Sequence, residues 1–275
     1  MNDNKIIIKP GKFTKQYLKD IWNYRELFYF LAWRDIKVRY KQTVIGIAWA
    51  VIRPLLTMLI FTVVFGKIAG LPSEVAVPYP LMVYAALLPW QFFANSLSES
   101  SESILVNTNL ISKVYIPRLI IPASKIVVAF VDFSISFFVF GFMMLYYNFL
   151  PSSRIFLLPF FLCLVFLISY GLSLWFCALN VKYRDVRHII PFLIQIGLYV
   201  SPVGFSSNIV SDKWRFIYSL NPMAGVIEGF RWAILGENVK LYLPGMYLSI
   251  IFTILILLSG LFYFRHSEDT FADHI

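Results

Sequence analysis

The sequence is short of charged residues, of cysteines and of the common catalytic motifs. Only 14% of its 275 residues are charged, whereas a soluble domain carries about a quarter, and 59% are hydrophobic. A folded interior of this size cannot hide so much apolar surface, so lipid must solvate much of it. The composition therefore predicts an integral membrane protein.

The two cysteines, Cys163 and Cys177, fall in one apolar stretch. Buried thiols in such surroundings act as small hydrophobes, so they predict neither a disulfide framework nor a metal site. Residues 1–40 are polar and basic, without a short apolar core that ends in small residues. We therefore expect no cleavable signal peptide.

Motifs for nucleotide binding and catalysis are missing from the sequence. It has no GxxxxGK[ST] loop, HExxH, CxxC pair or GxSxG, so we expect no Walker-type ATP binding, no catalytic residue, and no metal or other cofactor bound by this chain. Within the apolar stretches the ionisable residues are few, chiefly Arg53 and Asp132. We interpret them as a structural ion pair or as groups that face a water-filled cavity, with a proton relay as the alternative.

Six apolar stretches are long enough to cross a bilayer, which takes about 20 helical residues. Pro89, Gln91 and Asn95 interrupt the second stretch. A further apolar segment, 208–240, is broken by polar residues and proline, which predicts a re-entrant pair of short helices. The predicted fold is all-α, with a transmembrane domain over 44–264. Its predicted spans are 44–66, 79–97, 119–147, 155–180, 189–207 and 245–264.

The basic residues indicate which side of the membrane each connection faces. Most of the 24 Lys and Arg residues lie in four segments outside the spans, and the net charge of +9 forms no single stripe of the kind that binds nucleic acid. Because cytoplasmic loops are enriched in Lys and Arg, we expect these segments to be cytoplasmic. They are the N-terminal tail with the helix that follows it, the 98–118 connection, the turn at 181–188, and the C-terminal tail 265–275.

Residues 22–43, which follow the predicted tail 1–21, have the pattern of an amphipathic helix. Helical spacing places aromatic and apolar residues on one face and basic residues on another: Tyr29, Trp33, Ile36 and Tyr40, against Arg34, Lys37 and Lys41. Such a helix is expected to lie in the cytoplasmic interface of the membrane. A simple membrane anchor is the alternative.

Two cytoplasmic segments are candidates for docking another subunit. The 98–118 segment opens with Ser and Glu, as a helix N-terminus does, then carries an apolar stripe and a stop at Pro117, which predicts a helix. The second candidate is the charged turn at 181–188. Solvated loops that obey the charge rule are the alternative for both segments.

Five strings, in this order and spacing, resemble the permease subunits of ABC-2-type polysaccharide exporters. That family moves O-antigen, capsular polysaccharide or teichoic acid, and the resemblance covers about residues 27–264. The strings are GIAWAVIRPLLTMLIFTVVFG (46–66), PYPLMVYAALLPWQFF (78–93), LISKVYIPRLIIP (110–122), LNVKYRDVRHIIPFL (179–193) and LNPMAGVIEGFRWAILG (220–236).

The resemblance implies a six-helix permease in a bacterial inner membrane. It implies a homodimer with two copies of a separate subunit that binds ATP and Mg. It also implies a lipid-linked polysaccharide as substrate, with O-antigen favoured over capsular polysaccharide and teichoic acid. It further implies that 98–118 is a gating and coupling helix and that 208–240 forms a periplasmic gate. The residues expected to couple to the ATP-binding subunit are Asn107, Asn109, Lys113, Tyr115, Arg118, Arg184 and Asp185.

Substrate contacts are expected at two further sets of residues. Arg34, Lys37 and Arg39 are expected to recruit the lipid pyrophosphate. Aromatic side chains are expected to line the glycan path, with an interfacial aromatic belt as the alternative. They are Trp49, Tyr84, Trp90, Phe93 and Tyr199.

At the charged turn, Arg184 and Asp185 match a pair typical of the family. We expect an ion pair between them, with Asp185 also capping the next helix by accepting hydrogen bonds from the amides of 187–188. Two other function classes stay open: a proton-coupled flippase for lipid-linked sugars that uses Asp132, and a membrane transferase that acts on a lipid-linked substrate.

Overall fold

The computed structural model describes residues 15–41, 46–73, 77–183, 185–236 and 239–271. Over these residues the chain is helical, without strands. Four rods are long and apolar enough to cross a membrane: Ile47–Ile68, Ile120–Tyr146, Ser153–Lys182 and Leu243–Ser267. The predicted all-α membrane fold is therefore confirmed.

The four rods are made from six helical elements, and two of the rods carry a short turn of another helix type. Helix α3 runs into a π-helical turn, η1, and a 3₁₀ turn, η2, precedes α8. Another 3₁₀ turn, η5, follows α12. Their bounds are α3 Gly46–Phe61, η1 Thr62–Ile68, α7 Ile120–Tyr146, η2 Ser153–Leu157, α8 Leu158–Lys182, α12 Leu243–Ser267 and η5 Glu268–Thr270.

The other two predicted spans differ from the four rods. The stretch predicted at 79–97 is the 23-residue α4, Tyr79–Ser101, which is polar in its second half. The stretch predicted at 189–207 is α9, Val186–Val200, which has only 15 residues. Its predicted C-terminal end is wrong, because Ser201 is extended (φ −81°, ψ 154°) ahead of Pro202, as residues before proline usually are.

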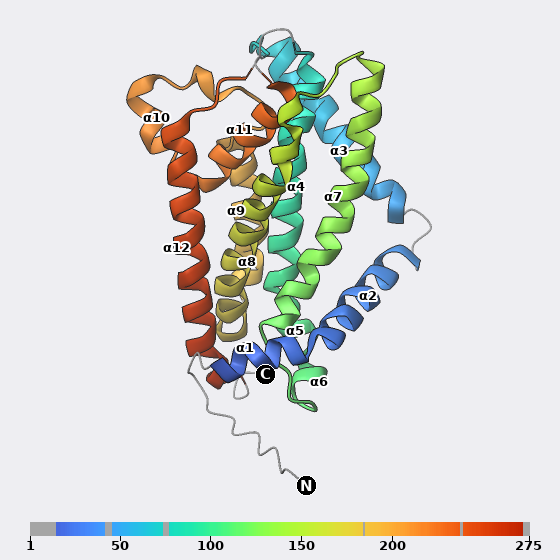
Figure 1. The fold of residues 1–275 in the computed structure, drawn as a ribbon, viewed down its shortest axis with the longest axis vertical. Helices are drawn as coiled ribbons and strands as arrows, with labels where there is room; N and C mark the ends of the chain where they lie inside the picture. The colour runs from blue at the N-terminus through green and yellow to red at the C-terminus, as the bar shows by residue number, and fades with distance from the viewer. Residues whose placement is uncertain (1–14, 42–45, 74–76, 184, 237–238, 272–275) are drawn as a thin grey trace.

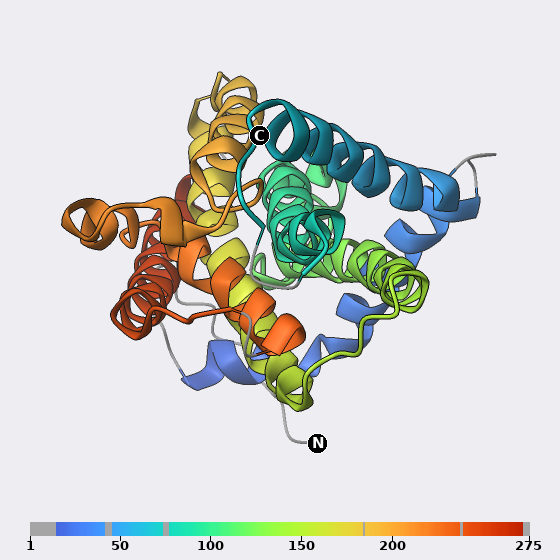
Figure 2. The ribbon, with the colours of Figure 1, turned by 90° about the horizontal axis from the view of Figure 1, so that it is seen from above.

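Helix α4 lies at the centre of the bundle. It packs against α3, α7, α8, α9 and the short helix α11, Pro222–Leu235, and Figure 2 shows it enclosed by its neighbours. Every residue from Leu81 to Leu88 is buried. A helix that is apolar on all sides fits such a central position, where protein rather than lipid surrounds it.

Helices α8 and α12 pack closely at a pair of glycines. A Cβ atom added to Gly260 on α12 would lie 2.3 Å from the carbonyl oxygen of Gly171 on α8. Small residues let helix backbones approach in this way, and they are common where membrane helices cross. The contact fixes the last span against the fourth.

The basic connections gather at one end of the bundle (Figure 1). Helices α1, Lys15–Asn23, and α2, Arg25–Lys41, lie there beside α5, Ser103–Val106, and α6, Thr108–Ile111. The predicted interface helix thus begins at Arg25, and α1 occupies part of the predicted tail. Residues 1–14, 42–45 and 272–275 of the predicted segments lie outside the described residues.

The predicted helix over 98–118 is wrong. Ser98–Ser101 complete α4, two short helical turns follow as α5 and α6, and the chain is irregular well before Pro117. The serine hydroxyls explain the difference. Ser101 and Ser103 donate hydrogen bonds backward to the carbonyls of Ser98 (2.9 Å) and Ser100 (2.6 Å), so they do not cap a new helix.

The opposite end holds the pair of short helices predicted within 208–240. They are α10, Asp212–Tyr218, and α11, and Asn221 caps α11 by accepting a hydrogen bond from the Met223 amide at 3.0 Å. The Arg231 side chain on α11 is buried, with 1% of the residue exposed. It donates to main-chain carbonyls of two other segments: those of Met82 (3.2 Å), Val203 (2.8 Å) and Phe205 (2.8 Å).

Candidate functional site

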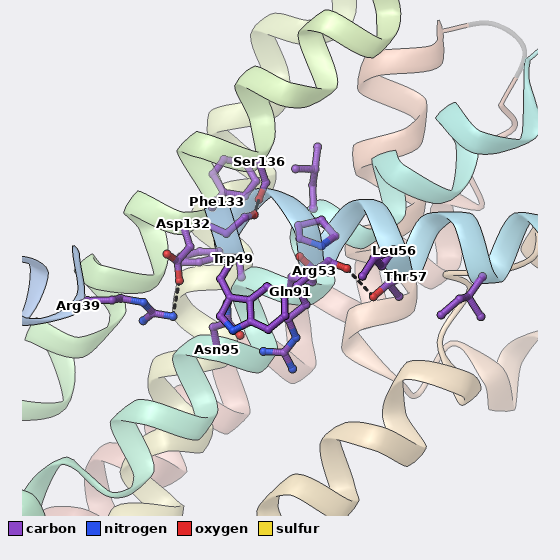
Figure 3. Close-up of a pocket in the computed structure, with 15 residues that line it drawn as sticks. Arg39, Trp49, Arg53, Leu56, Thr57, Gln91, Asn95, Asp132, Phe133 and Ser136 are labelled. Atoms are coloured by element: carbon purple, nitrogen blue, oxygen red, sulfur yellow. Dashed lines mark hydrogen bonds and ion pairs between the residues drawn. The ribbon is translucent and has the colours of Figure 1, made fainter. Parts of the chain in front are cut away.

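A cavity of about 830 Å³ lies between the end of α2 and helices α3, α4 and α7 (Figure 3). Each wall follows helical spacing, which brings residues three or four apart onto one face. Helix α3 contributes Trp49, Arg53 and Leu56–Thr57; α4 contributes Leu88, Gln91, Phe92 and Asn95; α7 contributes Asp132, Phe133 and Ser136; and Arg39 comes from α2.

A charged cluster closes one end of this cavity. The Arg39 guanidinium pairs with Asp132, with 2.7 Å between Nη2 and Oδ2, and also with Glu99. The Tyr40 hydroxyl donates to the other oxygen of Asp132. These contacts join α2 to both α4 and α7, and we call the four residues the inner ion cluster.

The inner ion cluster keeps its α2 members in defined protonation states. Burial disfavours the charged Arg39 guanidinium, but the carboxylates of Glu99 and Asp132 outweigh that cost, so the pKa of Arg39 is raised above its ordinary value. Burial and the hydrogen bond to Asp132 raise the pKa of Tyr40. Arg39 therefore stays charged and Tyr40 stays a donor at physiological pH.

A second ionic contact fastens the middle of α2. Asp35 pairs with Lys125 on α7 (2.9 Å) and with Arg34 beside it (2.8 Å). Arg34 also donates to the Asn107 side chain at 3.1 Å. Helix α2 is thus held to the bundle by ion pairs as well as by Leu31 and its apolar neighbours.

A family model described as the ABC-2 type transporter matches residues 26–235. The match covers the cavity, the inner ion cluster, α11 and five of the six helices in the predicted spans. The chain belongs to the ABC-2 type transporter family.

Three relatives of this ABC-2 protein are polysaccharide transport proteins by name. The O-antigen export system permease protein RfbA of Klebsiella pneumoniae is 29% identical over 226 residues, 79% of this chain and 86% of the relative. The protein of the same name from Myxococcus xanthus is 24% identical over 262 residues, 94% and 98% of the two chains. The polysialic acid transport protein KpsM of Escherichia coli is 23% identical over 243 residues, 86% and 91%.

The residues predicted to bind pyrophosphate differ in their surroundings, since two of them form ion pairs within the protein and the third is exposed. Arg34 and Arg39 pair with carboxylates of the protein. Lys37 is exposed, and its ammonium lies 5.2 Å from the centre of the Trp33 ring. The role in lipid recruitment stays a prediction.

The five aromatic residues predicted along the glycan path do not share one surface of the chain. Tyr84, Trp90 and Phe93 are buried within the bundle, and Tyr84 stacks on Phe140. Trp49 and Tyr199 are exposed, the first on the cavity wall and the second on α9. The role of these five residues in a glycan path stays a prediction.

The predicted coupling residues lie at the basic end of the bundle. Asn109, Lys113 and Tyr115 are exposed there. Asn107 is buried, donating to the Ser103 carbonyl at 2.8 Å, and Arg118 donates to the Glu268 carbonyl. The side chains of Asn107 and Arg118 thus bond to other parts of the same chain and stabilise the 98–118 connection.

The predicted helix cap at the charged turn is wrong. Asp185 occupies the N-cap position of α9, but its side chain makes no capping hydrogen bond. Its backbone is already helical (φ −72°, ψ −20°), and its main-chain carbonyl accepts from the His188 amide at 3.0 Å. The Asp185 side chain is exposed. Its predicted partner, Arg184, lies outside the described residues.

The sequence interpretation missed Glu99 and the polar role of Tyr40. The sequence pattern places Glu99 at a helix start and Tyr40 on an aromatic face, so it identifies neither as part of an ion cluster. The sequence carries only a partial signal, because Asp35 and Glu99 are acidic residues in segments expected to be cytoplasmic, but Glu26 and Glu102 lie in the same segments. Acidic residues in such places are candidates for ion pairs.

Proposed function

We propose that this chain is the membrane-spanning permease subunit of an ATP-driven polysaccharide exporter, with lipid-linked O-antigen as its substrate. The observation that carries the proposal is the family match together with the two O-antigen export permeases, one of which aligns over 94% of this chain. The exporter would work in a bacterial inner membrane and move the glycan from the cytoplasmic to the outer face.

A separate ATP-binding subunit is proposed as the energy source, because the sequence has no Walker motif. The basic end of the bundle supports such a partner. Val106 is 70% exposed there. The side chains of Val114, Tyr115 and Tyr183, which lie in the connections between spans, are exposed as well. Exposed apolar side chains in a water-facing region are typical of docking surfaces. We call these four residues the docking surface.

A homodimer with two copies of that subunit is proposed as the working assembly. Helices α3 and α9 both carry runs of exposed apolar side chains, among them Ile52, Leu59 and Phe192. A second copy of the chain would cover these faces and bring the exposed Trp49 and Tyr199 of each copy toward a shared path. The clustering of the basic segments at one end supports cytoplasmic N- and C-termini.

Capsular polysaccharide is the second candidate substrate, since KpsM aligns over 86% of this chain. Teichoic acid has no corresponding relative among these three. The proton-coupled flippase has less support than the permease, because both oxygens of Asp132 are engaged by Arg39 and Tyr40. Those contacts favour a structural role for Asp132.

Complementation distinguishes the two substrates. The chain, expressed together with its own ATP-binding subunit, is placed in one strain that lacks its O-antigen permease and in another that lacks its capsule permease. Surface polysaccharide is then measured with polymer-specific antibodies. Restored O-antigen alone supports the proposal, and restored capsule alone would replace O-antigen with the second candidate.

A further inference from the structure

The last span, α12, is followed by a turn that folds back at the basic end of the bundle (Figure 1). The 3₁₀ turn η5 is closed by a hydrogen bond that the Phe271 amide donates to the Glu268 carbonyl. Arg265, near the end of α12, pairs with the Glu268 carboxylate, and both of these residues are buried. The ion pair therefore fixes the turn against the end of the helix. We call residues 265–271 the C-terminal turn.

The Phe271 ring anchors the C-terminal turn by apolar packing. It is 1% exposed and meets Phe264 of α12 edge to face, with 5.3 Å between the ring centres. Phe271 belongs to a hydrophobic cluster that is separate from the large core of the bundle and that several segments share at the basic end. Other buried members of this cluster are Leu31, Ile104, Leu119 and Val181. A large aromatic side chain in such a place contributes strongly to packing.

Arg118 joins the C-terminal turn to the 98–118 connection. Its guanidinium lies 5.6 Å from the centre of the Phe271 ring and donates to the Glu268 carbonyl, the same carbonyl that closes the turn. Tyr115, three residues earlier, is near both the turn and α1. The pKa of its hydroxyl is raised, first by burial and then by the carboxylates of Asp20 and Glu268. The second half of the connection thus rests on the C-terminal turn.

We infer that the C-terminal turn is a latch that positions residues 113–118 for the ATP-binding subunit. The inference rests on the proposed function, because Val114 and Tyr115 in this stretch belong to the docking surface. Phe271, Arg265 and Glu268 are buried, so they act on a partner only through the connection. They are positioning residues.

The latch gives α12 a part in coupling. Among the described residues, none of α12 lines the cavity, whose walls come from α2, α3, α4 and α7. Helix α12 instead packs along α8 and ends in the turn that holds Arg118. The last span and the docking surface are therefore connected at the basic end, away from the cavity.

Hydrogen–deuterium exchange of the purified full-length protein in nanodiscs tests the latch without a partner. Phe271→Ala should speed exchange of the amides within 113–118 by at least about tenfold, because local opening becomes easier once the anchor is lost. Exchange in the centre of α4, residues 81–88, should not change. Phe271→Leu keeps an apolar side chain and should restore most of the protection. Phe262→Ala is the matched control, since Phe262 on α12 is 74% exposed.

Two results would overturn the latch. One is unchanged exchange over 113–118 in Phe271→Ala. The other is faster exchange that extends through the centre of α4, because Phe271 would then support the whole bundle. If Phe271→Ala does not fold, Arg118→Gln replaces it, since it removes the charged contact and leaves the apolar cluster in place. Arg118→Gln should also speed exchange over 113–118, and unchanged exchange in that variant would overturn the latch as well.

Binding of the ATP-binding subunit tests the positioning role. Phe271→Ala should raise the Kd for that subunit by about tenfold although Phe271 is buried, and Phe262→Ala should leave it unchanged. Val106→Asp, on the docking surface itself, is measured beside them. Weaker binding by Val106→Asp with unchanged binding by Phe271→Ala would overturn the positioning role and keep the docking surface.

Unchanged binding by both Val106→Asp and Phe271→Ala would overturn the docking surface and the positioning role together. None of these assays measures export or depends on the polysaccharide. Failure of the latch therefore leaves the complementation result untouched, and failure of complementation leaves the exchange result untouched.

Discussion

The Arg39 guanidinium on α2 lies 2.7 Å from the Asp132 carboxylate on α7. This ion pair links a helix at the basic end of the bundle to a membrane-spanning helix, and Glu99 extends the link to α4. A partner that shifts α2 would therefore move two helices that line the cavity. The inner ion cluster thus connects the proposed docking end of the bundle to the cavity.

The first prediction concerns the strength of that connection. Arg39→Met and Asp132→Asn should each lower the free energy of unfolding, and a double-mutant cycle should give a coupling free energy of about 1–2 kcal/mol for this largely buried pair. Denaturation by SDS in mixed micelles measures the four unfolding free energies. Additive effects of the two substitutions would show that the ion pair contributes no coupling.

The second prediction separates the ATP-driven permease from a proton-coupled flippase. Because Asp132 is ion-paired and hydrogen-bonded, Asp132→Asn should reduce export through weaker attachment of α2. Export by inverted vesicles that hold the complete exporter should persist with ATP when an uncoupler removes the proton gradient. Loss of export on adding the uncoupler, at constant ATP, would favour the flippase.

The third prediction concerns the glycine contact between α8 and α12. Gly260→Ala places a methyl group within 2.3 Å of the Gly171 carbonyl oxygen, so the helices must separate. The expected loss is about 1–3 kcal/mol in the free energy of unfolding, as in other overpacked contacts. Gly141→Ala is the matched control on α7, because its added Cβ meets nothing within 4 Å. Equal stability of the two variants would contradict this close packing.

The fourth prediction concerns the docking surface. Val106→Asp and Tyr115→Ala should weaken association with the ATP-binding subunit, because both side chains are exposed at the basic end. Co-purification with the partner measures the effect, and ATP hydrolysis by the isolated partner, which lacks this chain, should not change. Tyr146→Ala, exposed at the end of α7, is the control. Normal complex formation by Val106→Asp would place the contact elsewhere.

Most of the fold could be predicted because a membrane span depends on one continuous run of apolar residues in the sequence. Apolar runs of sufficient length fixed α3, α7, α8 and α12 to within a few residues. The end of α9 was also available, since Pro202 restricts Ser201 to an extended backbone. The predicted span runs past this stop, to residue 207, because the apolar composition continues beyond Pro202.

The ion pairs could not be predicted, because they join residues that are distant in the sequence. Nothing near Asp132 identifies Tyr40 or Arg39 as its partner, and nothing near Glu99 identifies Arg39. The serines of 98–103 were ambiguous for another reason. A hydroxyl can cap a helix that follows or bond back to one that precedes it, and only the backbone decides between them.

The most direct test of the central claim is transport by reconstituted protein. The chain and its ATP-binding subunit are placed together in proteoliposomes that contain fluorescent lipid-linked O-antigen, and the glycan that crosses the bilayer is measured by its accessibility to a quencher. We predict transport that requires both subunits and hydrolysable ATP. Transport by this chain alone, or equal transport with a non-hydrolysable ATP analogue, would contradict the account.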